Sequence, residues 1–99
     1  MTSLAIEIDV LSIQGVVVTE DALTVKLNDG RTLSTPLAWF PRLQNATGPE
    51  RLDFRLTGAG QGIHWPRLDE DVSLAGLIAG RPSSESPASL QAWLRTRTP

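Results

Sequence analysis

The four residues at positions 28–31, Asn-Asp-Gly-Arg, constrain the fold most, because they tolerate the positive φ angles that a tight β-turn requires. Before them, Leu23, Val25 and Leu27 alternate with polar residues, which is typical of a strand with one buried face. Residues 32–35 then supply a return strand. The sequence therefore predicts a β-hairpin, and with it a fold that contains antiparallel pairing.

Further extended segments precede and follow this hairpin. Apolar residues alternate at positions 4, 6, 8 and 10, and β-branched residues dominate 13–18, so this part predicts one long or two short strands. Leu52, Phe54 and Leu56 alternate with polar residues and predict another half-buried strand. Glycines at 58, 60 and 62 indicate a bend, a bulge or a close backbone approach, and residues 63–65 then resume extended structure.

Three short helices are expected between and after the strands. Leu37, Phe40 and Leu43 share one face of a helix over residues 37–46, with Pro41 near its first turn. A single turn is expected around residues 49–51. The acids Asp69-Glu70-Asp71 precede an apolar pattern that ends at Gly80, so they are expected at the N-terminus of a helix, where negative charge is favourable.

The size and composition limit the architecture to one small globular domain. The chain has 99 residues, of which 40% are apolar and 20% charged. We expect a single α+β domain over residues 1–80, with a small antiparallel β-sheet and two or three short helices packed on one face. Residues 81–99 are expected to form a Pro- and Ser-rich linker, followed by a short helix around Leu90, Trp93 and Leu94 or by a mobile tail.

The charge and residue content exclude several classes of function. The net charge of −2 argues against a basic surface for nucleic acid, and the absence of cysteine excludes disulfides and thiolate zinc sites. Acids interrupt the N-terminal apolar residues, which is unlike a signal peptide, and apolar runs are too short to span a membrane. We therefore expect a soluble, cytoplasmic protein without a cofactor or a metal.

The residues between Pro36 and Asp71 do not form a convincing catalytic set. His64 is the only histidine, and beside Trp65 it is more typical of a structural group than of a general base. The acids at 69–71 lack the spaced oxygen ligands of a calcium loop, and the three glycines lack the spacing of a phosphate-binding loop. No catalytic residue is assigned, and an enzyme is the less favoured interpretation.

Arginines and aromatic residues in the same stretch form a candidate contact surface, because planar cations and aromatic rings are enriched at protein interfaces and also stack on single-stranded nucleic acid. The alternative is that the aromatic rings belong to the core and the arginines pair with nearby acids. The candidate partner-binding residues are Trp39, Arg42, Arg51, His64 and Trp65.

The chain also resembles a known family. The resemblance rests on residues 28–31, 36–43, 50–51, 62–66 and 68–71, which occur in order within residues 16–80. On these residues the chain is similar to the bacterial family catalogued as domain of unknown function 2442. The resemblance implies a small α+β domain with an antiparallel sheet, and it supplies no catalytic residues. Family members are often encoded beside other small proteins, as in toxin–antitoxin pairs. Some carry a helix-turn-helix region, for which residues 81–99 are too short.

These observations lead to a ranked set of functional hypotheses. The first is a non-catalytic module that binds a protein partner, in the manner of an antitoxin. The second is a nucleic-acid accessory protein that uses the arginine and tryptophan residues, and the third is a small-ligand or enzyme site around His64 with Asp69 or Asp71. Self-association through a hairpin edge strand or the last helix is a separate expectation, so the partner is another protein or a second copy.

Overall fold

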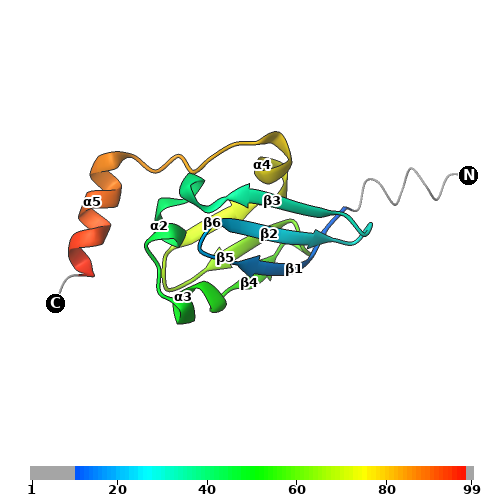
Figure 1. The fold of residues 1–99 in the computed structure, drawn as a ribbon, viewed down its shortest axis with the longest axis horizontal. Coiled ribbons are helices and arrows are strands. Elements are labelled where there is room, and N and C mark those ends of the chain that lie inside the picture. The colour runs from blue at the N-terminus through cyan, green and yellow to red at the C-terminus, as the bar shows by residue number, and fades with distance from the viewer. Residues whose placement is uncertain (1–10, 98–99) are drawn as a thin grey trace, which may run out of the picture.

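The computed structural model describes residues 11–97 and confirms the α+β class (Figure 1). Its strands form two antiparallel three-stranded sheets, in the orders β1-β2-β3 and β4-β5-β6. The strands are β1 (Ile13–Val18), β2 (Ala22–Leu27), β3 (Thr32–Pro36), β4 (Arg55–Thr57), β5 (Gly62–Trp65) and β6 (Glu70–Ser73). The helices are the 3-10 helix η1 (Leu37–Trp39), α2 (Pro41–Gln44), α3 (Gly48–Leu52), α4 (Leu74–Ala79) and α5 (Pro87–Thr96). The strand expected over residues 4–10 lies outside the described residues.

The hairpin expected from the Asn-Asp-Gly-Arg sequence is confirmed. β2 and β3 pair antiparallel, and Gly30 has a φ angle of 93°, which glycine adopts without a steric penalty. The carbonyl of Arg31 accepts the N–H of Leu27 at 2.8 Å and closes the loop. Leu23, Val25 and Leu27 are all buried, as the alternation predicted.

One hydrophobic core joins the two sheets and the short helices. Its buried residues are Ile13, Leu23, Val25, Leu27, Leu37, Phe40, Leu43, Ile63, Trp65, Leu68, Val72, Leu74 and Leu77. Each fully buried large apolar side chain contributes roughly 1.5–3 kcal/mol of transfer free energy. Because this set includes residues of both sheets, the sheets are two layers of the same core.

The helix expected over residues 37–46 is divided into η1 and α2. Phe40 separates them, with φ and ψ angles of −126° and 84°. A proline ring disfavours a helical conformation in the residue before it, so the chain leaves the helix at Phe40 and restarts it at Pro41. Leu37, Phe40 and Leu43 still reach the core, as their spacing predicted.

The turn expected around residues 49–51 is α3, and it begins with a capping box. The side chain of Thr47 accepts the N–H of Glu50 at 3.3 Å, and Glu50 Oε1 accepts the N–H of Thr47 at 2.8 Å. Leu52 ends this helix. The prediction of one half-buried strand through Leu52, Phe54 and Leu56 was therefore wrong in its start and in its buried face, because β4 begins only at Arg55 and the side chains of Leu52 and Leu56 are both exposed.

The three acids at 69–71 do not form a helix N-terminus, so that prediction was wrong. Asp69 has a φ angle of 49° in the turn before β6, and Glu70 and Asp71 are the first residues of that strand. Helix α4 begins later, at Leu74, because the Oγ atom of Ser73 accepts the N–H of Gly76 at 2.9 Å and caps it. The predicted stop at Gly80 is confirmed.

The bend expected from the alternating glycines lies between β4 and β5. Gly58 and Gly60 have positive φ angles of 55° and 87°. The carbonyl of Gly60 accepts the N–H of Ile13 at 2.8 Å, and a Cβ atom on Gly60 would lie 2.9 Å from the Cβ of Ser12. The bend thus brings the second sheet against the start of β1.

Helix α5 lies at the end of the molecule beside α2 (Figure 1), and none of its described residues is fully buried. Ser86 caps it by accepting the N–H of Ser89 at 3.1 Å. The helix contains Leu90, Trp93 and Leu94, the residues around which a last short helix was expected. The division of the chain into a domain up to residue 80 and a separate tail stays a prediction.

Candidate partner-binding surface

Trp65 belongs to the core and offers no surface to a partner. Its side chain is 0% exposed, and its Nε1–H donates to the carbonyl of Arg51 at 3.1 Å. Its ring lies 6.0 Å from that of Phe54 at an interplanar angle of 52°. Of the five candidate residues, Trp65 is therefore the one that the structure assigns to packing.

Arg42 holds α5 against the body of the protein. Its Nε atom donates to Glu85 at 2.8 Å, and one of its terminal nitrogens donates to the carbonyl of Leu68 at 2.8 Å. Its guanidinium carbon lies 5.2 Å from the ring centroid of Trp93. The guanidinium carbon of Arg97 lies 4.5 Å from the same centroid. We call Arg42, Glu50, Glu85, Trp93 and Arg97 the α5 clasp.

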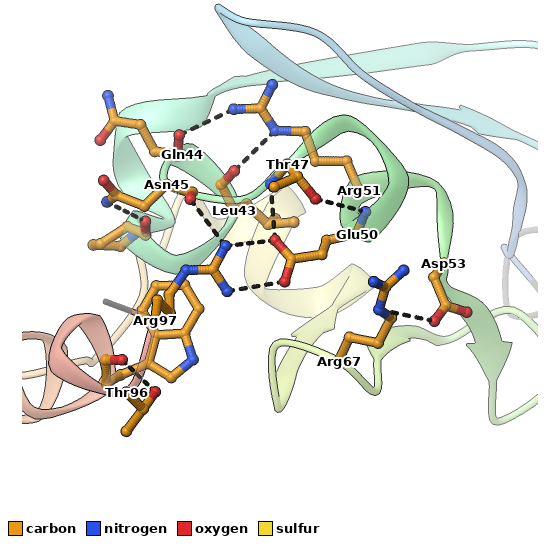
Figure 2. Close-up of polar contacts among 12 residues, drawn as sticks. Leu43, Gln44, Asn45, Thr47, Glu50, Arg51, Asp53, Arg67, Thr96 and Arg97 are labelled. Carbon is orange, nitrogen blue, oxygen red and sulfur yellow. Dashed lines mark hydrogen bonds and ion pairs between the residues drawn. The ribbon is translucent and has the colours of Figure 1, made fainter. Parts of the chain in front are cut away.

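Glu50 is the second acid of the α5 clasp (Figure 2). The guanidinium of Arg97 donates to both of its carboxylate oxygens, at 2.6 and 2.9 Å. These hydrogen bonds, helped by those to Thr47, lower the pKa of Glu50 to about 2, although partial burial opposes them. The carboxylate therefore stays charged over the physiological range and keeps α5 attached to α3.

Arg51 ties α2 and α3 together (Figure 2). It donates to the carbonyls of Leu43 and Gln44, at 3.0 Å each, and it contacts Glu20 at 3.3 Å. The side chain of Arg51 is mostly buried, whereas that of Glu20 is 90% exposed. The guanidinium is thus occupied by backbone carbonyls, and only its link to Glu20 faces the outside.

Trp39 and His64 make other contacts than those of Arg42 and Arg51. The ring of Trp39 is partly exposed, and its carbonyl accepts the N–H of Ser83 at 2.9 Å. His64 faces Asp71 across β5 and β6, with its Nδ1 atom 2.8 Å from a carboxylate oxygen. A cross-strand pair of this kind is an ordinary stabilising contact of a sheet. Because Trp65 is buried and Arg51 is mostly buried, the five residues predicted from sequence do not all lie on one exposed surface.

An apolar groove lies between β1 and α3, and Arg51 forms part of its wall. Its volume is about 470 Å³, and its lining consists of Val16, Val17, Val18, Thr19, Glu20, Gly48, Arg51, Leu52 and Phe54. This volume lies within the roughly 300–1,000 Å³ range of ligand pockets in proteins. The side chain of Leu52 is 79% exposed and that of Val17 is 55% exposed, so the groove displays apolar surface to solvent.

Within residues 11–97, the backbone of β1 presents unpaired groups to the same groove. β1 is an edge strand, with β2 as its neighbour on one side. The N–H of Thr19 donates to Ala22 at 2.9 Å, and Val17 is opposite Thr24. Antiparallel residues alternate between bonded and non-bonded pairs, so the amide groups of Val16 and Val18 point away from β2.

The other three sheet edges carry features that oppose strand pairing. β3 ends with Pro36, β4 begins with Arg55, and β6 contains Glu70 and Asp71. Charged residues and proline are common protection against edge-to-edge association. The register irregularity of β1 lies between Ile13 and Gly15 and leaves the uncharged stretch to Val18 regular. Among the four edges in residues 11–97, β1 is the one without a charge or a proline.

The alternating pattern around Leu52 did not predict this groove, for a local reason. The pattern is typical of a half-buried strand, whereas the capping box at Thr47 and Glu50 makes residues 48–52 helical and exposes Leu52. The Thr-Gly-Pro-Glu sequence did contain this signal, since a cap with a glutamate three residues later is typical of a helix start. The sequence gives no sign that β1 is an edge strand with an unpaired side, because that depends on which strands become neighbours in the fold.

Residues 11–97 contain neither a membrane-spanning helix nor a cluster of metal ligands. None of the helices there is long and apolar enough to cross a membrane. The described histidine, aspartate and glutamate side chains form no group of three or more that could hold a metal ion.

Comparison with known proteins identifies the family. A crystal structure of a protein of unknown function from Rhodospirillum rubrum ATCC 11170 is 27% identical, with a TM-score of 0.63 over 81% of this chain and 96% of that one. A solution NMR structure of an uncharacterised protein from Chromobacterium violaceum is 22% identical and shares the fold, with a TM-score of 0.65 over 95% of this chain and 83% of that one. No curated protein matches. The model of the family described as "Protein of unknown function (DUF2442)" matches residues 13–83, so the chain belongs to that family.

Proposed function

We propose that this protein is a non-catalytic binding module that takes up an extended segment of a protein partner as an additional strand beside β1. The observation that carries the proposal is the open, uncharged edge of β1 next to the apolar groove. Strand addition supplies affinity through main-chain hydrogen bonds and specificity through pockets for alternate side chains. Both components are available here.

The main-chain component comes from Val16 and Val18, whose outward amide groups offer two donors and two acceptors to an incoming strand. The side-chain component comes from the groove, where Leu52 and Phe54 flank the position that the new strand would occupy. Glu20 also lines the groove, and because its side chain is 90% exposed its carboxylate is the charge that the groove offers to a partner. The site is thus suited to an apolar segment with a polar or charged end.

An antitoxin-like role is the specific form of this proposal, in which the added strand belongs to a small protein encoded beside this one. The nucleic-acid alternative has less support, because the guanidinium groups of Arg42 and Arg51 already bind acids and backbone carbonyls within the chain. Phosphate binding would have to compete with these contacts.

Val16→Pro tests the main-chain component directly. Proline removes the N–H that points to the open edge, and it is tolerated on an edge strand at such a position. Leu52→Glu tests the groove, and Ile78→Glu is the matched control, because Ile78 is also exposed but lies on α4 outside the groove. Circular dichroism would verify that each variant is folded.

The proposal predicts that affinity capture from the native cell retains one protein in stoichiometric amount on the wild type and on Ile78→Glu. The same protein should be lost from Val16→Pro and from Leu52→Glu, and hydrogen exchange should slow at Val16 and Val18 when it binds. Retention on both groove variants, or no stoichiometric protein on the wild type and no self-association through β1, would refute the proposal.

A further inference from the structure

We propose that residues 4–10 of this chain pack with their apolar side chains in a second groove, at the opposite end of β1 from the groove beside α3. This contact goes beyond the proposed function, because it lies within one chain and extends the core instead of recruiting a partner. It follows from the apolar wall of the second groove, from the point where residues 4–10 join it, and from their pattern of apolar and acidic side chains.

The second groove lies between α4 and the strands β2 and β3, and we call it the hairpin groove. Its volume is about 230 Å³, and its lining consists of Leu11, Leu27, Arg31, Thr32, Leu33 and Ile78. Leu27 belongs to the core and Leu33 packs against it, whereas the side chain of Ile78 is 55% exposed. An apolar cavity of roughly 150 Å³ can hold a benzene molecule. The hairpin groove therefore has room for one or two aliphatic side chains, which would cover Ile78.

Residues 4–10 join the described part of the chain at the wall of this groove. Leu11 lines the groove, and its carbonyl accepts a hydrogen bond from Nε2 of Gln61 at 2.6 Å. The N–H of Ser12 donates to Oδ1 of Asn28 at 3.0 Å, and the N–H of Asn28 donates to the carbonyl of Ser12 at the same distance. The start of β1 and the turn between β2 and β3 accordingly lie at one end of the molecule (Figure 1). The backbone is thus held in place where the segment begins.

This attachment favours the chain's own segment over a separate molecule. An extended chain spans at most about 3.6 Å per residue, so Val10 and Ile8 stay within roughly 11 Å of Leu11. A group on so short a tether has an effective concentration in roughly the millimolar range. It also docks without the loss of translational and rotational freedom that a separate partner undergoes on binding.

The pattern of the segment fits a groove with an apolar wall and an open side. The apolar residues at positions 4, 6, 8 and 10 share one face of an extended chain, and Glu7 and Asp9 lie on the other. With the apolar face against Leu33 and Ile78, both carboxylates stay in water and no charge is buried.

The open edge of β1 is less accessible to this segment of the same chain. The N–H of Ile13 donates to the carbonyl of Gly60 at 2.8 Å, so the bend between β4 and β5 already contacts the start of β1. The groove beside α3 begins only at Val16. The segment would have to turn back past Gly60 to reach it, whereas the hairpin groove begins at Leu11 itself.

Methyl-labelled wild-type protein tests the contact directly. The chain has five isoleucines, at positions 6, 8, 13, 63 and 78, so selective labelling gives a simple spectrum. The methyl group of Ile78 should show a nuclear Overhauser effect to that of Ile8 or Ile6. Its absence for both residues overturns the proposal.

Thermal unfolding tests whether the contact stabilises the fold. Ile8→Glu and Ile78→Glu should each lower the midpoint by roughly 4–8 °C, as expected for the loss of one buried aliphatic side chain. The double variant should lose no more than the larger single loss, because both changes remove the same contact. Ala5→Glu, on the polar face, is the matched control and should leave the midpoint unchanged. Additive losses of Ile8→Glu and Ile78→Glu would contradict the proposal.

A mixed sample identifies the chain from which the segment comes. Labelled protein is unfolded in urea with an excess of unlabelled protein, and the two are refolded together. The Overhauser effect per labelled chain should be unchanged, because both isoleucines belong to one chain. Its loss would show that the segment of a second copy fills the groove and would overturn the proposal. The proposed function is tested separately, since Val16 and Leu52 are not part of the hairpin groove.

Discussion

The guanidinium of Arg97 donates to both carboxylate oxygens of Glu50 and thereby joins the last turn of α5 to the first turn of α3. Glu50 also accepts the N–H of Thr47, so one carboxylate both caps a helix and anchors another. These contacts have consequences for stability that depend on pH.

Glu50→Gln should make the folded protein less stable at neutral pH, by about 1 kcal/mol for a partly exposed ion pair that is also part of a helix cap. The pKa of Glu50 is lowered to about 2 in the folded state, from 4.5, chiefly by Arg97. Its contribution is therefore present above pH 4.5 and is lost as the pH falls toward 2. Urea unfolding at pH 7 and at pH 3, at one protein concentration, measures this. Asp53→Asn is the control, and an equal stability difference at both pH values would contradict the prediction.

Glu70→Gln should have the opposite pH dependence. Burial, and then repulsion from Glu85, raise the pKa of Glu70 to about 7. A carboxyl group with a raised pKa favours the folded state when it is protonated, and this contribution is lost as the pH rises from 4.5 through 7. Thermal unfolding should show Glu70→Gln melting several degrees above the wild type at pH 8 and close to it at pH 4. If the two proteins differ equally at both values, Glu70 is not the titrating group.

Trp93→Ala should detach α5 while the two sheets stay folded. The ring of Trp93 lies against the guanidinium groups of Arg42 and Arg97, and contacts of this kind contribute roughly 0.5–2 kcal/mol each. Amide hydrogen exchange should therefore accelerate within residues 87–96 and remain slow in β2 and β5. Gln91→Ala, an exposed position on the same helix, should leave both regions unchanged. Faster exchange throughout the sheets would show that Trp93 supports the whole core.

Gly60→Ala should destabilise the protein more than Gly30→Ala. Both glycines have positive φ angles, of 87° and 93°, so alanine is strained by roughly 1–2 kcal/mol at either. At Gly60 the added Cβ atom would also lie 2.9 Å from the Cβ of Ser12 and 3.0 Å from the carbonyl of Ile13, whereas at Gly30 it meets nothing within 4 Å. Urea unfolding of the two variants gives the difference, and equal losses would mean that Ser12 and Ile13 move aside without cost.

Local sequence patterns predicted the parts of the fold that depend on local chemistry. The hairpin followed from Asn-Asp-Gly-Arg, and the end of α4 followed from Gly80, because turn and cap residues act within a few positions. The acids at 69–71 were wrongly predicted to lie at a helix N-terminus. Glu70 and Asp71 instead belong to β6 and pair with β5. Pairing between distant segments overrides a weak local preference for a helix N-terminus.

The candidate surface was less predictable than the fold. Trp65 and Arg51 looked alike as interface residues in the sequence, yet the first is core and the second binds carbonyls of α2. Burial of an aromatic ring depends on which sheet faces it, and this information lies in the topology. Val17 and Leu52 form the exposed part of the groove. They could not be predicted as partner-binding residues from the sequence, because their position depends on which elements lie beside β1.

The burial of Trp65 gives the protein an intrinsic optical reporter. The chain has three tryptophans and no tyrosine, so its emission on ultraviolet excitation comes almost entirely from indole rings in three settings. Trp65 is enclosed in the core, Trp93 lies between two guanidinium groups, and Trp39 is partly in contact with solvent. Single-tryptophan variants would let core opening, helix detachment and solvent contact be followed as separate spectra in one small molecule.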